Sequence, residues 1–155
     1  MSKAQRQYGT AALLFIILMA GSIMADGIKT SINTQDKGAP FPPCPGTPNC
    51  VSSLAKDPAR KVDPFPVQGT PQESLDLLAG IIQSMPRSKI VSASSQRMEV
   101  EFRSILGFVD DLVLAVSADE KVIHVRSAAR SGTWDLGVNR RRVERIRKKY
   151  LENGK

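Results

Sequence analysis

Arginine is the residue type with the clearest chemical potential in this chain, and it is concentrated near the C-terminus. Seven arginines lie between Arg126 and Arg147, and residues 121–155 hold eleven Lys and Arg against three Asp and Glu. Guanidinium groups bind carboxylates and phosphates, often through two parallel hydrogen bonds. Residues 26–120 hold nine basic and twelve acidic residues, although the whole chain has a net charge of +7. This excess of positive charge near the C-terminus indicates either an anion-binding surface or a network of ion pairs with carboxylates of the same chain.

Three consecutive arginines, Arg140 to Arg142, stand where the last helix should begin. The N-terminus of a helix carries partial positive charge, so cations there need a negative partner. One possibility is a purely structural network of ion pairs that would fix the last helix to the sheet. The acidic partners of the arginines in this network would be Asp110, Asp111 and Asp135.

A bound anion is the second possibility for the same turn. Free N–H groups at a helix N-terminus attract anions, and the backbone around Gly137 would supply them. Arginine side chains nearby would add charge-assisted hydrogen bonds. The residues expected to contact the ligand are Arg126, Arg130, Asn139, Arg140 and Arg141.

A third possibility makes Asp110 and Asp111 the metal ligands or the acid and base of a hydrolase-like enzyme. Adjacent residues on a strand point to opposite faces, so both reach one site only if the chain bends there. The single histidine, His124, is expected in a solvated or hydrogen-bonded role. No serine lies in a nucleophile-elbow pattern, and there is no glycine-rich phosphate loop. The sequence therefore favours a protein without catalytic residues, with the enzyme as an alternative.

The scaffold that positions these side chains is predicted from residue 70 onwards. Thr70 to Glu73 form a capping box with proline at the first helical position, and apolar residues follow at helical spacing up to Ile82. Alternating apolar residues then predict two hairpins, and thus four strands, between residues 89 and 125. A last helix should begin at about Arg140, with Asn139 as its N-cap.

The expected fold class is α+β. It is a two-layer sandwich in which a four-stranded, mainly antiparallel sheet carries two helices on one face, in the order α-β-β-β-β-α. This core would occupy residues 70–153 of a single domain that spans residues 40–153. One histidine and two cysteines cannot complete a tetrahedral metal site, so neither a metal nor a cofactor is expected.

Residues 40–69, called the arm below, hold eight of the ten prolines of the chain. Proline lacks the N–H that a helix or a central strand requires, so the arm is predicted to be irregular and to lie over the domain. It contains the only two cysteines, Cys44 and Cys50, whose spacing differs from the Cys-x-x-Cys of redox or zinc motifs. Because the turn-forming residues between them fold the chain back, we expect a disulfide rather than two reactive thiols.

The N-terminus has the pattern of a targeting segment. Lys3 and Arg6 precede an uncharged stretch at residues 7–25, which indicates a signal peptide or an uncleaved membrane anchor. Residues 26–39 would be a flexible tether. In both cases the remainder would be exported to the periplasm or envelope. Nucleic acid is then an unlikely partner, whereas an anionic membrane surface could contact the basic last helix.

Three motifs in one order are similar to those of a known family. They are Cys44-Pro-Gly-Thr-Pro-Asn-Cys-Val-Ser-Ser53, Phe108-Val-Asp-Asp111, and Val125-Arg-Ser-Ala-Ala-Arg-Ser-Gly132 running into Asp135-Leu-Gly-Val-Asn-Arg-Arg-Arg-Val-Glu144. With them the chain resembles the domain-of-unknown-function family 1499 over roughly residues 40–147. The family pattern has Ser at Ala129 and Tyr-Ser at Thr133-Trp134. The resemblance implies a protein of bacterial envelopes or plastids and implies no particular activity.

Together, these observations predict a non-catalytic exported module that binds an anionic small molecule or partner beside the turn from Arg126 to Arg142. The partner itself cannot be identified from the pattern. A scaffold domain with an internal Arg–Asp network is the first alternative, and the hydrolase-like enzyme is the second.

Overall fold

The first helix, α1 (Pro71–Gln83), begins at the predicted capping box. The Thr70 hydroxyl accepts a hydrogen bond from the N–H of Glu73, and the Glu73 carboxylate accepts one from the N–H of Thr70. Leu75, Leu78 and Ile82 are essentially fully buried along one stripe of the helix. The structure, a computed structural model, describes residues 39–154, which belong to one compact unit.

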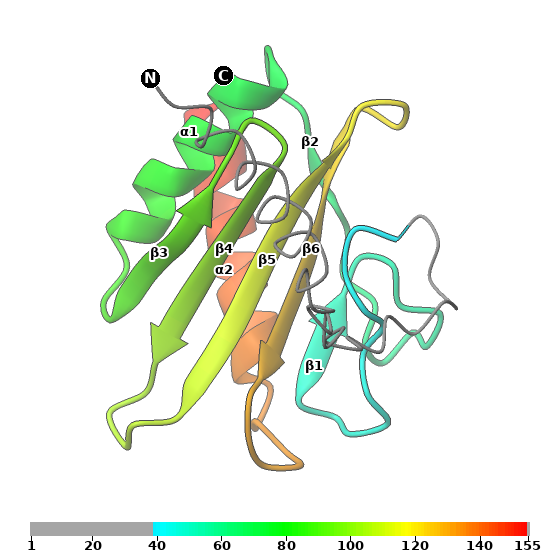
Figure 1. Ribbon diagram of the computed structural model, residues 1–155, viewed down its shortest axis with the longest axis vertical. Coiled ribbons are helices and arrows are strands. Elements are labelled where there is room, and N and C mark those ends of the chain that lie inside the picture. Colours follow the sequence, from blue (N-terminus) through cyan, green and yellow to red (C-terminus); the bar gives the residue numbers. More distant parts are fainter. Residues whose placement is uncertain (1–38, 155) are drawn as a thin grey trace, which may run out of the picture. The chain divides into compact units, whose positions relative to one another are not determined.

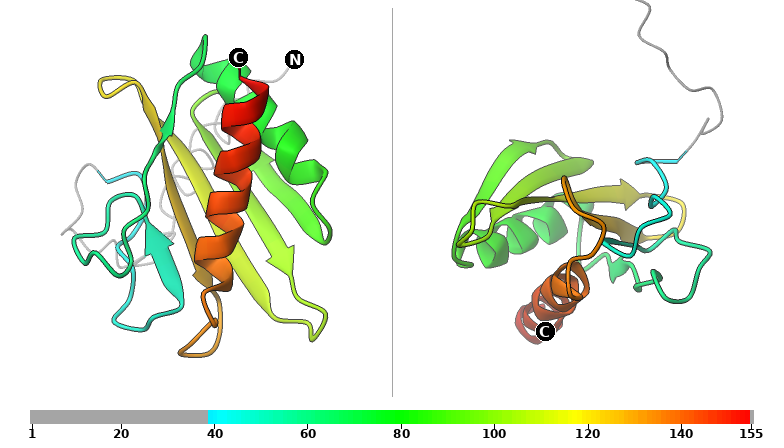
Figure 2. Two further views of the ribbon diagram at one scale, coloured as in Figure 1. Left: turned by 180° about the vertical axis from the view of Figure 1, so that it is seen from behind. Right: turned by 90° about the horizontal axis from the view of Figure 1, so that it is seen from below.

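Six strands form one antiparallel sheet, in the order β1-β6-β5-β4-β3, and β2 also pairs with β6. The helix α2 follows the last strand, and both helices cover the same face of the sheet (Figure 1, Figure 2). The bounds are β1 (Cys50–Ser52), β2 (Phe65–Pro66), β3 (Ser88–Ala93), β4 (Arg97–Arg103), β5 (Val109–Ser117), β6 (Val122–Ala129) and α2 (Val138–Asn153). The α+β class is thus confirmed. The predicted count of four strands is wrong, because the element order is β-β-α-β-β-β-β-α.

The two additional strands come from the arm, which is a structural part of the domain and not only a cover. β1 and β2 pair with successive parts of β6, on the edge opposite β3. Pro66 fits into β2 because a strand at the edge of a sheet can do without one N–H donor. Val51, Val62 and Phe65 of the arm are buried in the hydrophobic core. The prediction missed these strands because segments of two or three residues show no periodicity.

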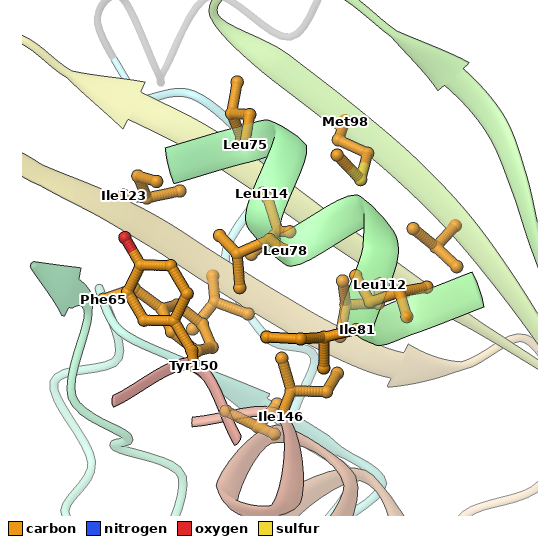
Figure 3. Close-up of a cluster of buried hydrophobic side chains, with 14 of the residues drawn as sticks. Phe65, Leu75, Leu78, Ile81, Met98, Leu112, Leu114, Ile123, Ile146 and Tyr150 are labelled. Carbon is orange, nitrogen blue, oxygen red and sulfur yellow. The ribbon is translucent and has the colours of Figure 1, made fainter. Parts of the chain in front are cut away.

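The core lies between the sheet and the two helices (Figure 3). In β4, Met98, Val100 and Phe102 are buried while the residues between them are more exposed, as the alternation predicts. The ring of Phe65 packs edge-on against Tyr150 of α2, with centroids 5.7 Å apart. The Tyr150 hydroxyl donates to the carbonyl oxygen of Pro66 at 2.9 Å. The arm, the sheet and the last helix therefore share one core.

The last helix begins earlier than predicted. Its N-cap is Gly137, whose φ of 76° is a left-handed conformation that glycine adopts without steric cost. Asn139 is therefore not the N-cap but lies inside the first turn, where it is fully buried. Val143, Ile146 and Tyr150 form the buried apolar stripe of the helix.

The predicted disulfide joins Cys44 to Cys50, with Cα atoms 5.6 Å apart. The predicted targeting segment (1–25) and nearly all of the predicted tether (26–38) lie outside the described residues. Within residues 39–154, no helix combines the length and the apolar character needed to cross a bilayer.

Candidate anion-binding site

Asp110 and Asp111 point to opposite faces of the sheet, as the pleat of β5 requires. Asp110 faces the helices, and its carboxylate lies 2.6 Å from the guanidinium of Arg142 on α2. Both side chains of this pair are nearly buried, with exposed fractions of 13% and 11%. The Arg142 guanidinium also stacks over the ring of Phe102, 4.5 Å from its centroid. This pair attaches the last helix to the sheet, and it leaves Asp110 and Asp111 without a common site.

Asp111 lies on the helix-free face, where it binds Arg130. The guanidinium of Arg130 donates to both carboxylate oxygens of Asp111, at 2.8 and 2.7 Å, and to Glu101 on β4. The hydrogen bond from Arg130 lowers the pKa of Glu101, and the bonds to Asp111 and Glu101 raise the pKa of Arg130. Two carboxylates thus neutralise Arg130, which removes it as a free anion ligand.

Arg126 lies on the helix-free face of the sheet. Asp111 on that face pairs with Ala128 of β6, and Arg126 is two residues from Ala128 along the strand, so both point to the same side. Its Nε atom is buried and has no hydrogen-bond partner among residues 39–154. Burial lowers the pKa of Arg126, while the charge of Asp111 opposes that shift. The structure therefore separates Arg126 and Arg130 on the sheet from Arg140 and Arg141 on the helix.

The N–H groups predicted to hold an anion are occupied by Asp135. Its carboxylate accepts hydrogen bonds from the N–H groups of Gly137 and Asn139, at 2.9 and 2.8 Å, and from the side chain of Asn139. The amide of Asn139 also donates to the carbonyl oxygen of Asn49 in the arm. Asn139 is thus a buried structural residue, and Asp135 is the negative group that the helix N-terminus requires.

We expect the replacement of Asp135 by alanine to lower the free energy of unfolding by about 1 to 2 kcal/mol, because two N–H groups lose their acceptor. Burial opposes the ionisation of Asp135, but the N–H groups of Asn139 and Gly137 outweigh it and lower its pKa. A carboxyl with a lowered folded-state pKa stabilises the protein above its unfolded pKa, and this contribution disappears as the pH falls through the folded pKa.

The wild type should therefore lose stability below about pH 4, and Asp135→Ala should lose less over that range. Urea unfolding at several pH values measures both effects. Asp119→Ala is the control, because Asp119 is an exposed carboxylate in the β5–β6 turn. Equal pH dependence in the two variants would contradict the assigned role of Asp135.

Two other arginines of α2, Arg140 and Arg147, bind carbonyl oxygens of the arm, and Arg147 also lies 3.2 Å from the carboxylate of Glu144. Arg140 donates to the carbonyls of Ala59 and Lys61, at 2.8 and 2.9 Å. Arg147 donates to two further arm carbonyls and lies over the ring of Phe65. A proline-rich segment has more acceptors than donors, and arginine has five N–H donors and no acceptor. This complementarity explains why the arm and the basic helix pack together.

Arg140 borders a pocket of about 220 Å³ at the arginine turn. The indole of Trp134 and the guanidinium of Arg60 also line it. Arg60 lies 3.5 Å from Asp57, whereas Arg140 has no carboxylate within 4 Å among residues 39–154. Neither Trp134 nor Arg60 is among the ligand-binding residues predicted from the sequence. The position of the single tryptophan beside the arginines is the only sequence signal for Trp134.

A larger pocket of about 450 Å³ lies between two segments of the arm. Phe41, Pro42 and Leu54 give it a mainly apolar wall, and Lys56 and Arg60 add positive charge. It does not border the arginine turn. We therefore regard the smaller pocket as the candidate site, because there an uncompensated guanidinium is held in place.

Ser53, His124 and Glu120 have the order of a serine hydrolase triad. The Ser53 hydroxyl lies 3.2 Å from His124 Nδ1, and His124 Nε2 lies 3.2 Å from Glu120. However, Ser53 is 2% exposed and lines neither pocket, and its Oγ accepts a hydrogen bond from the N–H of Val125. A nucleophile must reach its substrate. These contacts therefore hold the arm to β6, and among residues 39–154 no acidic, histidine or cysteine cluster could bind a metal.

Comparison with known proteins supports one assignment. The model of the family described as "Protein of unknown function (DUF1499)" matches residues 41–150, from the arm to the end of the core. No curated protein matches the chain, and no solved structure does. The matched segment covers more than half of the chain and contains all three motifs noted above. The chain therefore belongs to the DUF1499 family of proteins of unknown function.

Proposed function

We propose that this domain is a non-catalytic module of the cell envelope that binds a small anionic molecule in the pocket beside Trp134 and Arg140. The proposal depends mainly on the contacts of the Arg140 side chain. Its guanidinium is held by two backbone carbonyls, which orient it without neutralising its charge. Such a fixed cation binds an anion with little loss of conformational freedom.

The acidic residues that line the pocket have other partners. Asp57 lies within ion-pair distance of Arg60, and both oxygens of Asp135 accept hydrogen bonds from the first turn of α2. The lining therefore holds two arginines and two aspartates, and its formal charge is zero. Arg60 is paired with Asp57, and Asp135 caps α2, so Arg140 is the charged group of the lining that has no carboxylate partner among residues 39–154. Its guanidinium is the group that would attract a negative ligand.

The size of the pocket and its aromatic wall limit the ligand class. About 220 Å³ is below the usual range for sites that hold drug-sized molecules, so the ligand is a small carboxylate or phosphate ester. Trp134 offers an apolar face, with 69% of its surface exposed. A ligand with a short apolar or ring portion would cover this face while its anionic group contacts Arg140.

A panel of small phosphates, carboxylates and acidic sugars in a thermal-shift assay tests the proposal. A ligand that binds only the folded protein raises its melting temperature, and the increase grows with ligand concentration. We expect at least one anion to stabilise the wild type and to stabilise Arg140→Gln much less. Arg145→Gln is the matched control, because it removes the same charge from an exposed position of α2 outside the pocket.

The scaffold alternative has its own support in the Asp110–Arg142 pair, which joins the sheet to α2. It predicts that no anion in the panel stabilises the wild type more than Arg140→Gln. That result would remove the binding proposal. An equal loss of stabilisation in Arg145→Gln would instead show that general positive charge, and not the pocket, attracts the anion.

A further inference from the structure

The exposed apolar side chains of the domain are concentrated in two loops. Nine large apolar side chains are exposed among residues 39–154; five of them lie between β4 and β5 or between β6 and α2, and a sixth, Val138, is the first residue of α2. These six, called the apolar tips below, are Ile105, Leu106, Phe108, Trp134, Leu136 and Val138. Soluble monomers rarely gather exposed apolar residues in this way, so the tips indicate a contact surface.

Both loops leave the same end of the sheet. β5 begins where β6 ends, because Asp110 pairs with Ala129 and the N–H of Arg130 donates to the carbonyl oxygen of Val109 at 3.0 Å. Figure 1 shows the two loops at the lower end of the sheet, away from the C-terminus. The apolar tips thus lie together at one end of the sheet.

The tips project from the domain and do not form a groove. Ile105 and Leu106 are each 83% exposed, so the domain itself covers little of either side chain. Leu136 has a φ of 55°, a left-handed conformation unfavourable for leucine, and its side chain is also exposed. Projecting side chains of this kind fit insertion into a lipid layer better than docking on the surface of a folded protein.

The charge at this end of the sheet is weakly positive. Arg103, Arg130 and Arg142 pair with the carboxylates of Glu101, Asp111 and Asp110, and Asp135 caps N–H groups of α2. Arg87 and Arg141 also lie there, so five arginines against four acids leave a charge of +1. Neither Arg87 nor Arg141 has a carboxylate within 4 Å among residues 39–154, and Arg141 donates to the carbonyl oxygen of Leu136. A weakly basic end with apolar and tryptophan side chains matches the interface of an anionic bilayer.

We propose that the apolar tips dock this domain onto the surface of a bilayer that contains anionic lipid. Ile105, Leu106 and Phe108 enter the boundary between headgroups and acyl chains, and Trp134 lies at headgroup level. The predicted anchor at residues 7–25 would keep the domain close enough, because residues 26–38 reach about 45 Å at full extension. Docking goes beyond the anion pocket, since most of the tips lie outside its lining.

The only tryptophan of the chain, Trp134, is a direct probe of this docking. The full chain is reconstituted into vesicles of phosphatidylglycerol and phosphatidylcholine whose acyl chains carry bromine, which quenches tryptophan at short range. We expect quenching at least about twofold stronger in the wild type than in the Ile105→Glu, Leu106→Glu variant. That variant keeps the N-terminal segment, so the difference isolates the tips.

Leu151→Glu is the matched control, because Leu151 is an exposed apolar residue near the C-terminal end of α2. It should be quenched like the wild type. Equal quenching in the wild type and the double variant would overturn the proposal. An absence of quenching in both proteins would also overturn it, and this is the result expected if the tips bind a protein partner instead. Without vesicles, the double variant should keep the anion response of the wild type, so failure of docking is distinguishable from failure of the pocket.

Discussion

Replacement of Phe65 by alanine is expected to lower the free energy of unfolding by about 3 to 5 kcal/mol, which is the usual cost of truncating a buried phenylalanine. Phe65 belongs to the arm and is fully buried. Its ring contacts Tyr150 edge-on, and the guanidinium of Arg147 lies over its face at 4.6 Å. The substitution would therefore leave a cavity between the arm, the sheet and α2.

Chemical denaturation followed by circular dichroism measures this loss. Phe108→Ala is the matched control, because Phe108 is 56% exposed in the β4–β5 loop. Its cost should stay within about 0.5 kcal/mol, as for most surface substitutions. If Phe65→Ala cost less than about 1 kcal/mol, the arm would lie outside the core after all.

The second large effect is expected at Arg142. Replacing it by alanine should cost about 3 to 5 kcal/mol, because Asp110 would remain nearly buried without a cation and Phe102 would lose its stacked partner. The double variant Asp110→Leu, Arg142→Met should recover most of this loss, since a buried ion pair and an apolar pair of similar size are often nearly equal in stability.

Arg130→Ala is the comparison for this pair, because the contacts of Arg130 with Asp111 and Glu101 are solvent-exposed and screened. Its effect on unfolding should be much smaller than that of Arg142→Ala. Equal losses would show that burial does not distinguish the two ion pairs. Failure of the double variant to recover stability would show that the hydrogen bonds of Arg142 to Ser127 and Asn139 dominate its role.

Much of the fold could be predicted where local chemistry and periodicity agree. The capping box at Thr70 and Glu73 marks the start of α1, and the alternation of Met98, Val100 and Phe102 marks a strand with one buried face. The strands of the arm could not be predicted, because β2 has two residues and includes a proline. Such segments become strands only through pairing with β6, which is a tertiary effect.

The candidate site could be predicted only in part. The pleat already places Asp110 and Asp111 on opposite faces, and the structure has them so. The helix N-cap could not be identified, because Asn139 is a favourable N-cap type while a glycine in a left-handed conformation holds the position. The partners of Arg140 were also hidden, since the carbonyls of Ala59 and Lys61 have no signature in the sequence.

The central claim, that an anion binds beside Trp134 and Arg140, is tested most directly by the fluorescence of Trp134 in solution. Because the chain has one tryptophan, a saturable change in its emission during an anion titration reports the pocket alone. We predict a dissociation constant at least about tenfold weaker in Arg140→Gln than in the wild type, and unchanged in Arg145→Gln. Equal affinity in all three proteins, or no saturable change with any anion that stabilises the wild type, would contradict the claim.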